Sequence, residues 1–232
     1  MNDSTHHQPR NRRSAFTLIE LLVVIAVIGV LASLIFPITS VLKKKRMITV
    51  AQAELGQVET AIDAYKAKYG TYPPDNPGNY LINQLYFELE GTVLNKGVYQ
   101  TLDGSGQIST AQITTMFGAN VAGFVNSSAS AKGTDDKGAA INFLKDLRPN
   151  QIGKWTFGAQ TVNAILVCSV SWDNVSTQPL ASPPAAQNGL NPWRYISSSP
   201  TNNPNSYDLW VDLLIGTKTN RISNWSKQPQ VL

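Results

Sequence analysis

The stretch that decides the fold of this chain reads Phe16-Thr17-Leu18-Ile19-Glu20-Leu21-Leu22-Val23-Val24-Ile25. Before it, residues 1–15 form a polar leader that carries three arginines and ends at Ala15. After it, no residue from Leu21 to Leu42 is charged. At 1.5 Å per residue this run makes a helix of roughly 33 Å, which is long enough to cross the apolar core of a bilayer. The sequence therefore predicts a membrane-spanning helix directly after a polar leader.

Two other kinds of apolar segment have to be weighed against a spanning helix. An ordinary secretory signal peptide has an apolar part of roughly 7–15 residues followed by a small-x-small cleavage site. The run here is longer, and Pro37-Ile38-Thr39-Ser40 is a poor site of that kind. An uncleaved signal-anchor helix of an unrelated enzyme stays open as the second alternative. The basic residues do not choose the orientation, because three flank the run on one side and four on the other.

Glu20 is the one acidic residue within this apolar helix. A carboxylate there costs roughly 2.5–3.5 kcal/mol on membrane-insertion scales, so it needs a partner. Cleavage after Ala15 would supply one, because the new α-amine of Phe16 is cationic near neutral pH. That amine lies four residues before Glu20, on the same helical face or within reach of a neighbouring helix. The alternative is that Glu20 serves only the N-terminus of its own helix.

From Ser14 to Pro37 the chain resembles the type IV pilins and the type II secretion pseudopilins. The resemblance implies that a prepilin peptidase cuts between Ala15 and Phe16 and that the new amine of Phe16 is methylated. We expect Glu20 to drive assembly by pairing with the Phe16 amine of an adjacent subunit. The family usually has glycine before the cut, so Ala15 implies slower processing. Gly29 and Pro37 weaken the helix locally, and the resemblance implies that this region can lose helical order when subunits pack into a filament.

Beyond the basic run Lys43–Arg46, apolar or small residues recur at spacings of three and four. This stripe consists of Ile48, Ala51, Leu55, Val58, Ile62, Tyr65 and Tyr69. It predicts one narrow apolar face on a helix that ends at Gly70 and Tyr72-Pro73-Pro74. A coiled-coil dimer is the competing interpretation, but the stripe spans about three heptads and has weak members, so docking onto a sheet is favoured.

The remainder is rich in Gly, Pro, Asn and Ser and predicts short elements joined by turns. We expect a helix over 80–90, a variable insert near 95–136 with weak strands, a helix over 139–147 and a strand over 162–172. The two segments 191–196 and 206–212 predict an antiparallel hairpin.

The hairpin segments carry a second resemblance, to the C-terminal strands of the major pseudopilins. There, as here, a Pro-Trp segment precedes a Tyr-Asp-Leu segment, which in this chain is Tyr207-Asp208-Leu209. In that subfamily the following loop can bind calcium. Calcium prefers several carboxylates, yet no acidic residue follows Asp212 in this chain. Asp208 and Asp212 are the only candidate ligands, and we expect hairpin and turn chemistry from both rather than a metal site.

Composition argues against an enzyme and against nucleic-acid binding. The only histidines, His6 and His7, lie in the leader, and the single Cys168 lies in an apolar run. No paired nucleophile and base or multi-cysteine metal site can be built from them. Residues 47–232 contain twelve basic and thirteen acidic residues. The electrostatic term that drives nucleic-acid binding is therefore missing there.

The sequence thus predicts an α+β fold, with a long N-terminal helix packed on a small C-terminal antiparallel sheet. The resemblance implies that this arrangement is pilin-like. We divide the chain into a leader (1–15), a transmembrane half of the first helix (16–42), its amphipathic soluble half (43–70) and a globular head (71–232). The resemblance implies an inner-membrane pseudopilus subunit with a periplasmic head and no cofactor. Its expected partners are further copies, other pseudopilins, the prepilin peptidase and the inner-membrane assembly platform. A pilin or minor pilin for adhesion, motility or DNA uptake, and an anchored surface enzyme or receptor, remain alternatives.

Overall fold

The computed structural model of the chain describes residues 17–129, 138–180 and 188–232, and it describes residues 34–40 by their backbone only. The chain divides into two compact units, Met1–Lys44 and Lys45–Leu232. We call the second unit the head. One helix, α1 (Leu18–Tyr69), contributes residues to both units.

Helix α1 runs without a break through Gly29 and Pro37. It ends where the sequence predicted. Gly70 has a φ of 77°, in the left-handed region that glycine tolerates best, and its N–H donates to the Lys66 carbonyl at 2.8 Å. The predicted weakness between Gly29 and Pro37 stays a prediction, because the side chain of Pro37 lies outside the described part.

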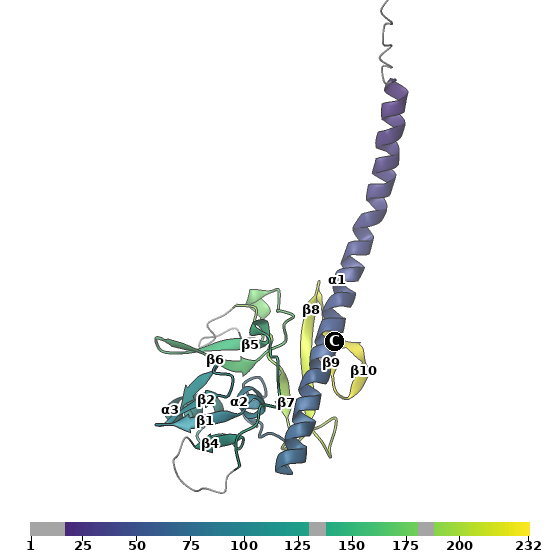
Figure 1. Cartoon of the computed structure of the whole chain (residues 1–232). Helices are drawn as coiled ribbons and strands as arrows, with labels where there is room; N and C mark the ends of the chain where they lie inside the picture. The colour runs from purple at the N-terminus through teal and green to yellow at the C-terminus, as the bar shows by residue number, and fades with distance from the viewer. Residues whose placement is uncertain (1–16, 130–137, 181–187) are drawn as a thin grey trace, which may run out of the picture. The chain divides into compact units, whose positions relative to one another are not determined.

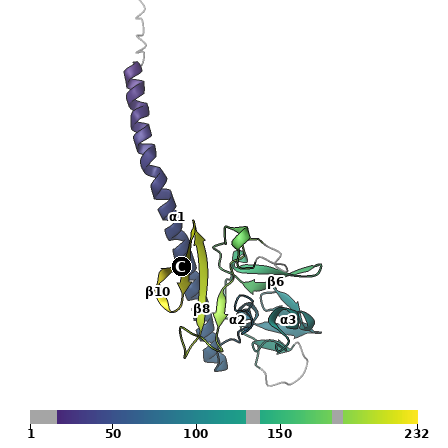
Figure 2. The same ribbon diagram turned by 180° about the vertical axis from the view of Figure 1, so that it is seen from behind.

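The part of α1 that belongs to the head buries the predicted stripe. Five of its residues are at most 7% exposed: Ala51, Leu55, Val58, Ile62 and Tyr65. Ile48 and Tyr69 are half-buried at its two ends. The same core contains Leu209, Val211 and Leu213 from the C-terminal sheet, which lies beside this part of α1 in both views (Figure 1 and Figure 2). The prediction that the stripe docks onto a sheet is confirmed.

The C-terminal sheet has four antiparallel strands in the order β10-β9-β8-β7. They are β7 (Arg194–Ile196), β8 (Asp208–Ile215), β9 (Lys218–Ser223) and β10 (Ser226–Val231). Strands β7 and β8 pair with Tyr195 opposite Leu209, so the predicted hairpin is confirmed. Along β8, every second residue enters the core under α1 because successive side chains point to opposite faces.

The middle of the head forms a second four-stranded sheet and a separate hairpin. The sheet order is β3-β2-β1-β4, in which only β1 and β4 are parallel. The strands of this sheet are β1 (Thr92–Asn95), β2 (Val98–Thr101), β3 (Gln107–Ser109) and β4 (Ser127–Ala129). Helix α2 (Leu85–Glu90) precedes β1 along the chain, and helix α3 (Thr110–Phe117) follows β3. The hairpin consists of β5 (Ile152–Phe157) and β6 (Gln160–Leu166), and short 3-10 turns occur at Pro149–Gln151 and Val175–Thr177.

Three expected elements differ from the structure. The helix expected over 80–90 begins only at Leu85, because the Asn83 side chain accepts from the Leu85 N–H. The strand expected over 162–172 is shifted to Gln160–Leu166. The helix expected over 139–147 is wrong. The backbone of this segment forms tertiary hydrogen bonds instead of helical ones. The Phe143 N–H donates to the Leu89 carbonyl, and the Ile141 N–H donates to the Asn126 side chain.

Candidate functional site

The first turn of α1 holds the residue to which the sequence assigned assembly. Oε2 of Glu20 accepts hydrogen bonds from the N–H and from Oγ1 of Thr17, both at 2.8 Å. The Glu20 N–H donates back to Thr17 Oγ1 at 3.3 Å. This reciprocal pair is a capping box that satisfies the free donors at a helix start. Within one chain, Glu20 therefore serves its own helix N-terminus, which is the alternative that the sequence left open.

The predicted cleavage pair Ala15 and Phe16 lies outside the described residues. Directly after it, the apolar side chains of α1 from Leu18 to Leu31 are exposed, with exposed fractions from 46% to 81% among the large ones. Contiguous apolar surface of this kind marks contact with other proteins or with lipid. Among the described residues, no helix meets the length and hydropathy expected of a membrane span. The predicted span over 21–42 includes residues 34–40, whose side chains lie outside the described part.

Buried carboxylates tie α1 to the rest of the head. Glu88 of α2 is fully buried and accepts from the Tyr65 hydroxyl of α1 at 3.0 Å. It also accepts from the backbone N–H groups of Val125 and Asn126. Burial raises the pKa of Glu88, although these three donors favour its ionised form. Nearer the middle of α1, the carboxylate of Glu54 accepts from the N–H and the hydroxyl of Ser169.

Asp208, the first of the two candidate calcium ligands, organises the loop before β8. Its Oδ2 accepts from the N–H groups of Thr201 and Asn202 and from the Asn202 side-chain amide, each at 2.9 Å. Its Oδ1 accepts from the Asn203 N–H at 2.9 Å. Both oxygens of this buried carboxylate are therefore engaged in a turn of the chain.

Asp212, the second candidate, forms an ion pair on β8. Arg221 of β9 binds it through two parallel hydrogen bonds, from Nε to Oδ1 at 2.8 Å and from Nη2 to Oδ2 at 3.0 Å. Arg194 of β7 adds a third contact at 3.7 Å. This two-pronged geometry is the strong form of an arginine–carboxylate pair. Among the described residues, no group of three acidic, histidine or cysteine side chains is arranged to hold a metal.

Comparison with known proteins bears on the first helix. Residues 10–36 match the family model described as the prokaryotic N-terminal methylation motif. This chain carries a prepilin-type N-terminus. The matched residues include Ala15, Phe16 and Glu20, so the prepilin-type segment covers the capping box and the exposed apolar helix described above. No solved structure matches this chain.

Relatives of this chain carry two different names. Type II secretion system core protein G of Pseudomonas aeruginosa is 35% identical over 69 residues, which are 30% of this chain and 49% of the relative. The protein of the same name from Escherichia coli is 40% identical over 68 residues, which are 29% and 47% of the two chains. Fimbrial protein EcpB of Eikenella corrodens is 29% identical over 158 residues, which are 66% and 89%. The chain thus spans about half the length of the core G proteins that it matches.

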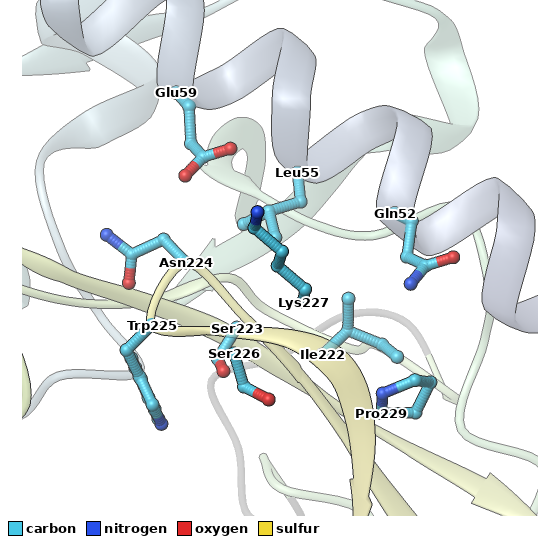
Figure 3. Close-up of a pocket in the computed structure, with 10 residues that line it drawn as sticks. All are labelled: Gln52, Leu55, Glu59, Ile222, Ser223, Asn224, Trp225, Ser226, Lys227 and Pro229. Atoms are coloured by element: carbon cyan, nitrogen blue, oxygen red, sulfur yellow. The ribbon is translucent and has the colours of Figure 1, made fainter.

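A groove lies along α1 in the head of this chain. It has a volume of about 400 Å³ and lies between α1 and the turn from β9 to β10. Figure 3 shows Gln52, Leu55 and Glu59 on the helix, with Lys227 reaching from the start of β10 toward them. Burial, and the like charge of Asp63 one helical turn away, raise the pKa of Glu59. Neither acid has an ion-pair partner among the residues that the structure describes.

Sequence reasoning missed the buried polar residues that fix the head. Glu88 and Asn126 are both fully buried, and the Asn126 side chain bonds the carbonyls of Glu88 and Ile141 as well as the Tyr69 hydroxyl. The signal available was the segment Leu85-Tyr86-Phe87-Glu88-Leu89-Glu90, in which two acids interrupt a strongly apolar run. No sequence pattern around Asn126 indicates its role, because that role depends on the distant residues to which its side chain bonds.

Proposed function

We propose that this chain is a structural subunit of a type II secretion pseudopilus and not an enzyme. A prepilin peptidase removes residues 1–15 and methylates Phe16, and the segment 16–42 anchors the subunit in the inner membrane with its head in the periplasm. Subunits then polymerise with further copies and other pseudopilins on the inner-membrane assembly platform, and the growing filament drives export of proteins.

One observation carries this proposal. A prepilin-type motif lies on a helix whose apolar first part is exposed and whose second part is docked by a buried stripe onto an antiparallel sheet. A helix with an exposed apolar surface of this kind needs lipid or other subunits to cover it. Glu59, which lines the groove, and the exposed Asp63 one helical turn away add an anionic patch that a cationic group of a neighbouring subunit would complement.

A pilus subunit is the second candidate function. The match to the fimbrial protein spans 89% of that relative, whereas the core G matches span about half of theirs. A subunit of an adhesive or motile pilus uses the same anchor and the same polymerisation. The two functions differ in what the polymer does once it is built.

Complementation separates the two functions. The chain is expressed in a host whose secretion machinery lacks its own core protein G, and in parallel in a piliated host that lacks its major pilin. Recovery of secreted enzyme activity in the first host alone supports the secretion subunit, and recovery of surface pili in the second alone supports the pilin. Chemical cross-linking that yields no ladder of multimers in either host would contradict polymerisation itself.

A further inference from the structure

A cleft in the middle of the head is lined by no residue of α1. It lies between the turn that joins β2 to β3 and the β5–β6 hairpin. We call it the turn–hairpin cleft, and its lining residues are Asp103, Ser105, Leu147, Pro149, Ile152, Lys154 and Asn163. Its volume is about 700 Å³, within the range of roughly 300–1,000 Å³ that ligand sites in proteins occupy. A second hollow of about 490 Å³ shares Ser105, Lys154 and Asn163 with it and continues it along the turn.

An irregularity of strand pairing shapes the hairpin wall of the cleft. Gly153 pairs with Ile165, but Lys154 pairs with Asn163, so Ala164 is an extra residue on β6. Such a bulge re-aims side chains, and bulges are over-represented beside functional sites. Here it sets Lys154 directly opposite Asn163, and both line the cleft. Without the bulge, one of these two side chains would point to the other face of the hairpin.

The wall formed by the turn is held rigidly. The Asn163 side-chain amide donates to the Ser105 carbonyl at 2.7 Å, and the Ser105 and Tyr86 hydroxyls lie 2.7 Å apart. At Gly106 an added Cβ would lie 2.6 Å from the Tyr86 ring, so the turn presses directly onto α2. The Ser105 N–H donates to Asp103 Oδ1 at 3.0 Å. These contacts fix the carboxylate of Asp103 at the mouth of the cleft, and such preorganisation reduces the entropy lost on binding.

The cleft carries two opposite charges that do not neutralise each other. Partial burial raises the pKa of the Asp103 carboxyl, but hydrogen bonds from Ser105 and Thr101 outweigh it and hold that pKa below its usual value. Asp103 is therefore an anion at neutral pH, and Lys154 is a cation. Neither forms a salt bridge within the described part of the chain. Leu147, Pro149 and Ile152 supply an apolar wall.

We propose that the turn–hairpin cleft binds a short peptide segment, with a cationic group against Asp103 and a carboxylate against Lys154. The Asn163 side-chain oxygen, which accepts no hydrogen bond among the described residues, is available to a backbone N–H of that peptide. The ligand is dipolar because the two protein charges are separate and unpaired, and the apolar wall holds a side chain between them. The proposal stands independently of the choice between secretion and pilus, because the cleft uses no residue of α1.

The test uses the full chain in detergent and end-blocked, dye-labelled pentapeptides with lysine first and glutamate last. A matched set carries glutamine in both places. Fluorescence anisotropy should show binding of the charged set and not of the glutamine set. Asp103→Asn retains an oxygen that can accept from the Ser105 N–H, and Lys154→Gln changes an exposed side chain. Each should weaken binding by about three- to fivefold, because ion pairs at exposed side chains are weakened by solvent.

Lys218→Gln is the matched control, since it removes the same charge from an exposed position at the start of β9. It should bind like the unmodified chain. Equal binding of the charged and glutamine sets, or unchanged binding by Asp103→Asn and Lys154→Gln, would overturn the proposal. A photo-reactive residue in place of the exposed Pro149 then identifies the source of the peptide. A cross-linked dimer assigns it to a second copy, an adduct with an exported polypeptide assigns it to cargo, and no adduct in the assembling cell counts against the site.

Discussion

Ala15 and Phe16 are the predicted cleavage pair. We expect cleavage between them and methylation of the new amine, because a polar leader changes abruptly to an apolar helix there and the prepilin-type motif covers both residues. Intact-mass measurement of the membrane-extracted protein should give a mass that lacks residues 1–15 and includes one methyl group. Ala15→Gly should be processed faster than the unmodified chain in a pulse–chase experiment. A mature pool that retains only the leader form would contradict this assignment.

Glu20 is expected to control assembly rather than insertion. In Glu20→Gln, the amide oxygen can still accept from Thr17, so the capping box and the helix start are retained. Only the charge that would pair with the Phe16 amine of a neighbouring subunit is lost. In the unmodified chain, an unpaired carboxylate in an apolar layer costs roughly 2.5–3.5 kcal/mol, and pairing in the polymer relieves that cost. Glu20→Gln removes this driving force, so cross-linked multimers should fall more than tenfold while cleavage stays normal. Multimers at the unmodified level would remove the pairing and leave Glu20 as a helix cap.

Glu90 is expected to make the head less stable at alkaline pH. Burial first, and repulsion from Asp103 second, raise the pKa of this carboxyl to about 8. Its pKa is raised on folding, so the folded state binds the proton more tightly than the unfolded state does. Its contribution to stability is therefore largest below about pH 4.5 and is lost as the pH rises to about 8.

Glu90→Gln tests this dependence. The amide oxygen can still accept from the Asn142 side chain, which donates to Glu90 at 2.6 Å. Compared with the unmodified chain, the variant should gain up to about 4 kcal/mol of unfolding free energy between pH 5 and pH 9. Denaturant unfolding followed by tryptophan fluorescence measures the difference. Asp103→Asn should move the midpoint of the pH profile downward, and a gain that does not change with pH would contradict the assignment to Glu90.

At the scale of elements, the docking of α1 depends on polar contacts as well as on its apolar stripe. Tyr65→Phe removes the hydroxyl that donates to the buried Glu88 and retains the ring. We expect a loss of about 1–2 kcal/mol in unfolding free energy, because the carboxylate loses one of three donors in a buried site. Tyr80→Phe is the control, since that side chain is 45% exposed. Equal losses in the two variants would show that the contact between Tyr65 and Glu88 does not stabilise the head.

The elements that were predicted well are those whose own sequence pattern suffices. Helix α1 carries its stripe, its glycine end and its capping box within a single continuous segment. The segment 139–147 has a helical pattern too, but its N–H groups at Ile141 and Phe143 are taken by Asn126 and Leu89. Tertiary hydrogen bonds of this kind override local propensity and leave no mark in the segment itself.

For the whole molecule, we expect calcium to leave the stability unchanged. Asp208 already accepts four hydrogen bonds, and Asp212 is paired with two arginines. A ligand at a hundred times its dissociation constant stabilises the folded state by about 2.7 kcal/mol. Thermal melts in millimolar calcium, with magnesium and a chelator as controls, should therefore coincide. A clear rise of the melting temperature in calcium alone would show that the loop after β8 rearranges to bind it.

The sequence by itself determined the first helix with its glycine end and its docked face, and the C-terminal hairpin, because each is specified by residues that lie close together along the chain. The anchor and the place of cleavage stay predictions from the same local residues. Only the tertiary structure decided the order of the two sheets, the partners of Glu88 and Asn126, and the meeting of Asp103 with Lys154 in one cleft. Asp103 and Lys154 are brought together by a strand bulge and by a turn packed on α2. Such contacts depend on how distant segments pack, and no local periodicity or motif encodes that packing.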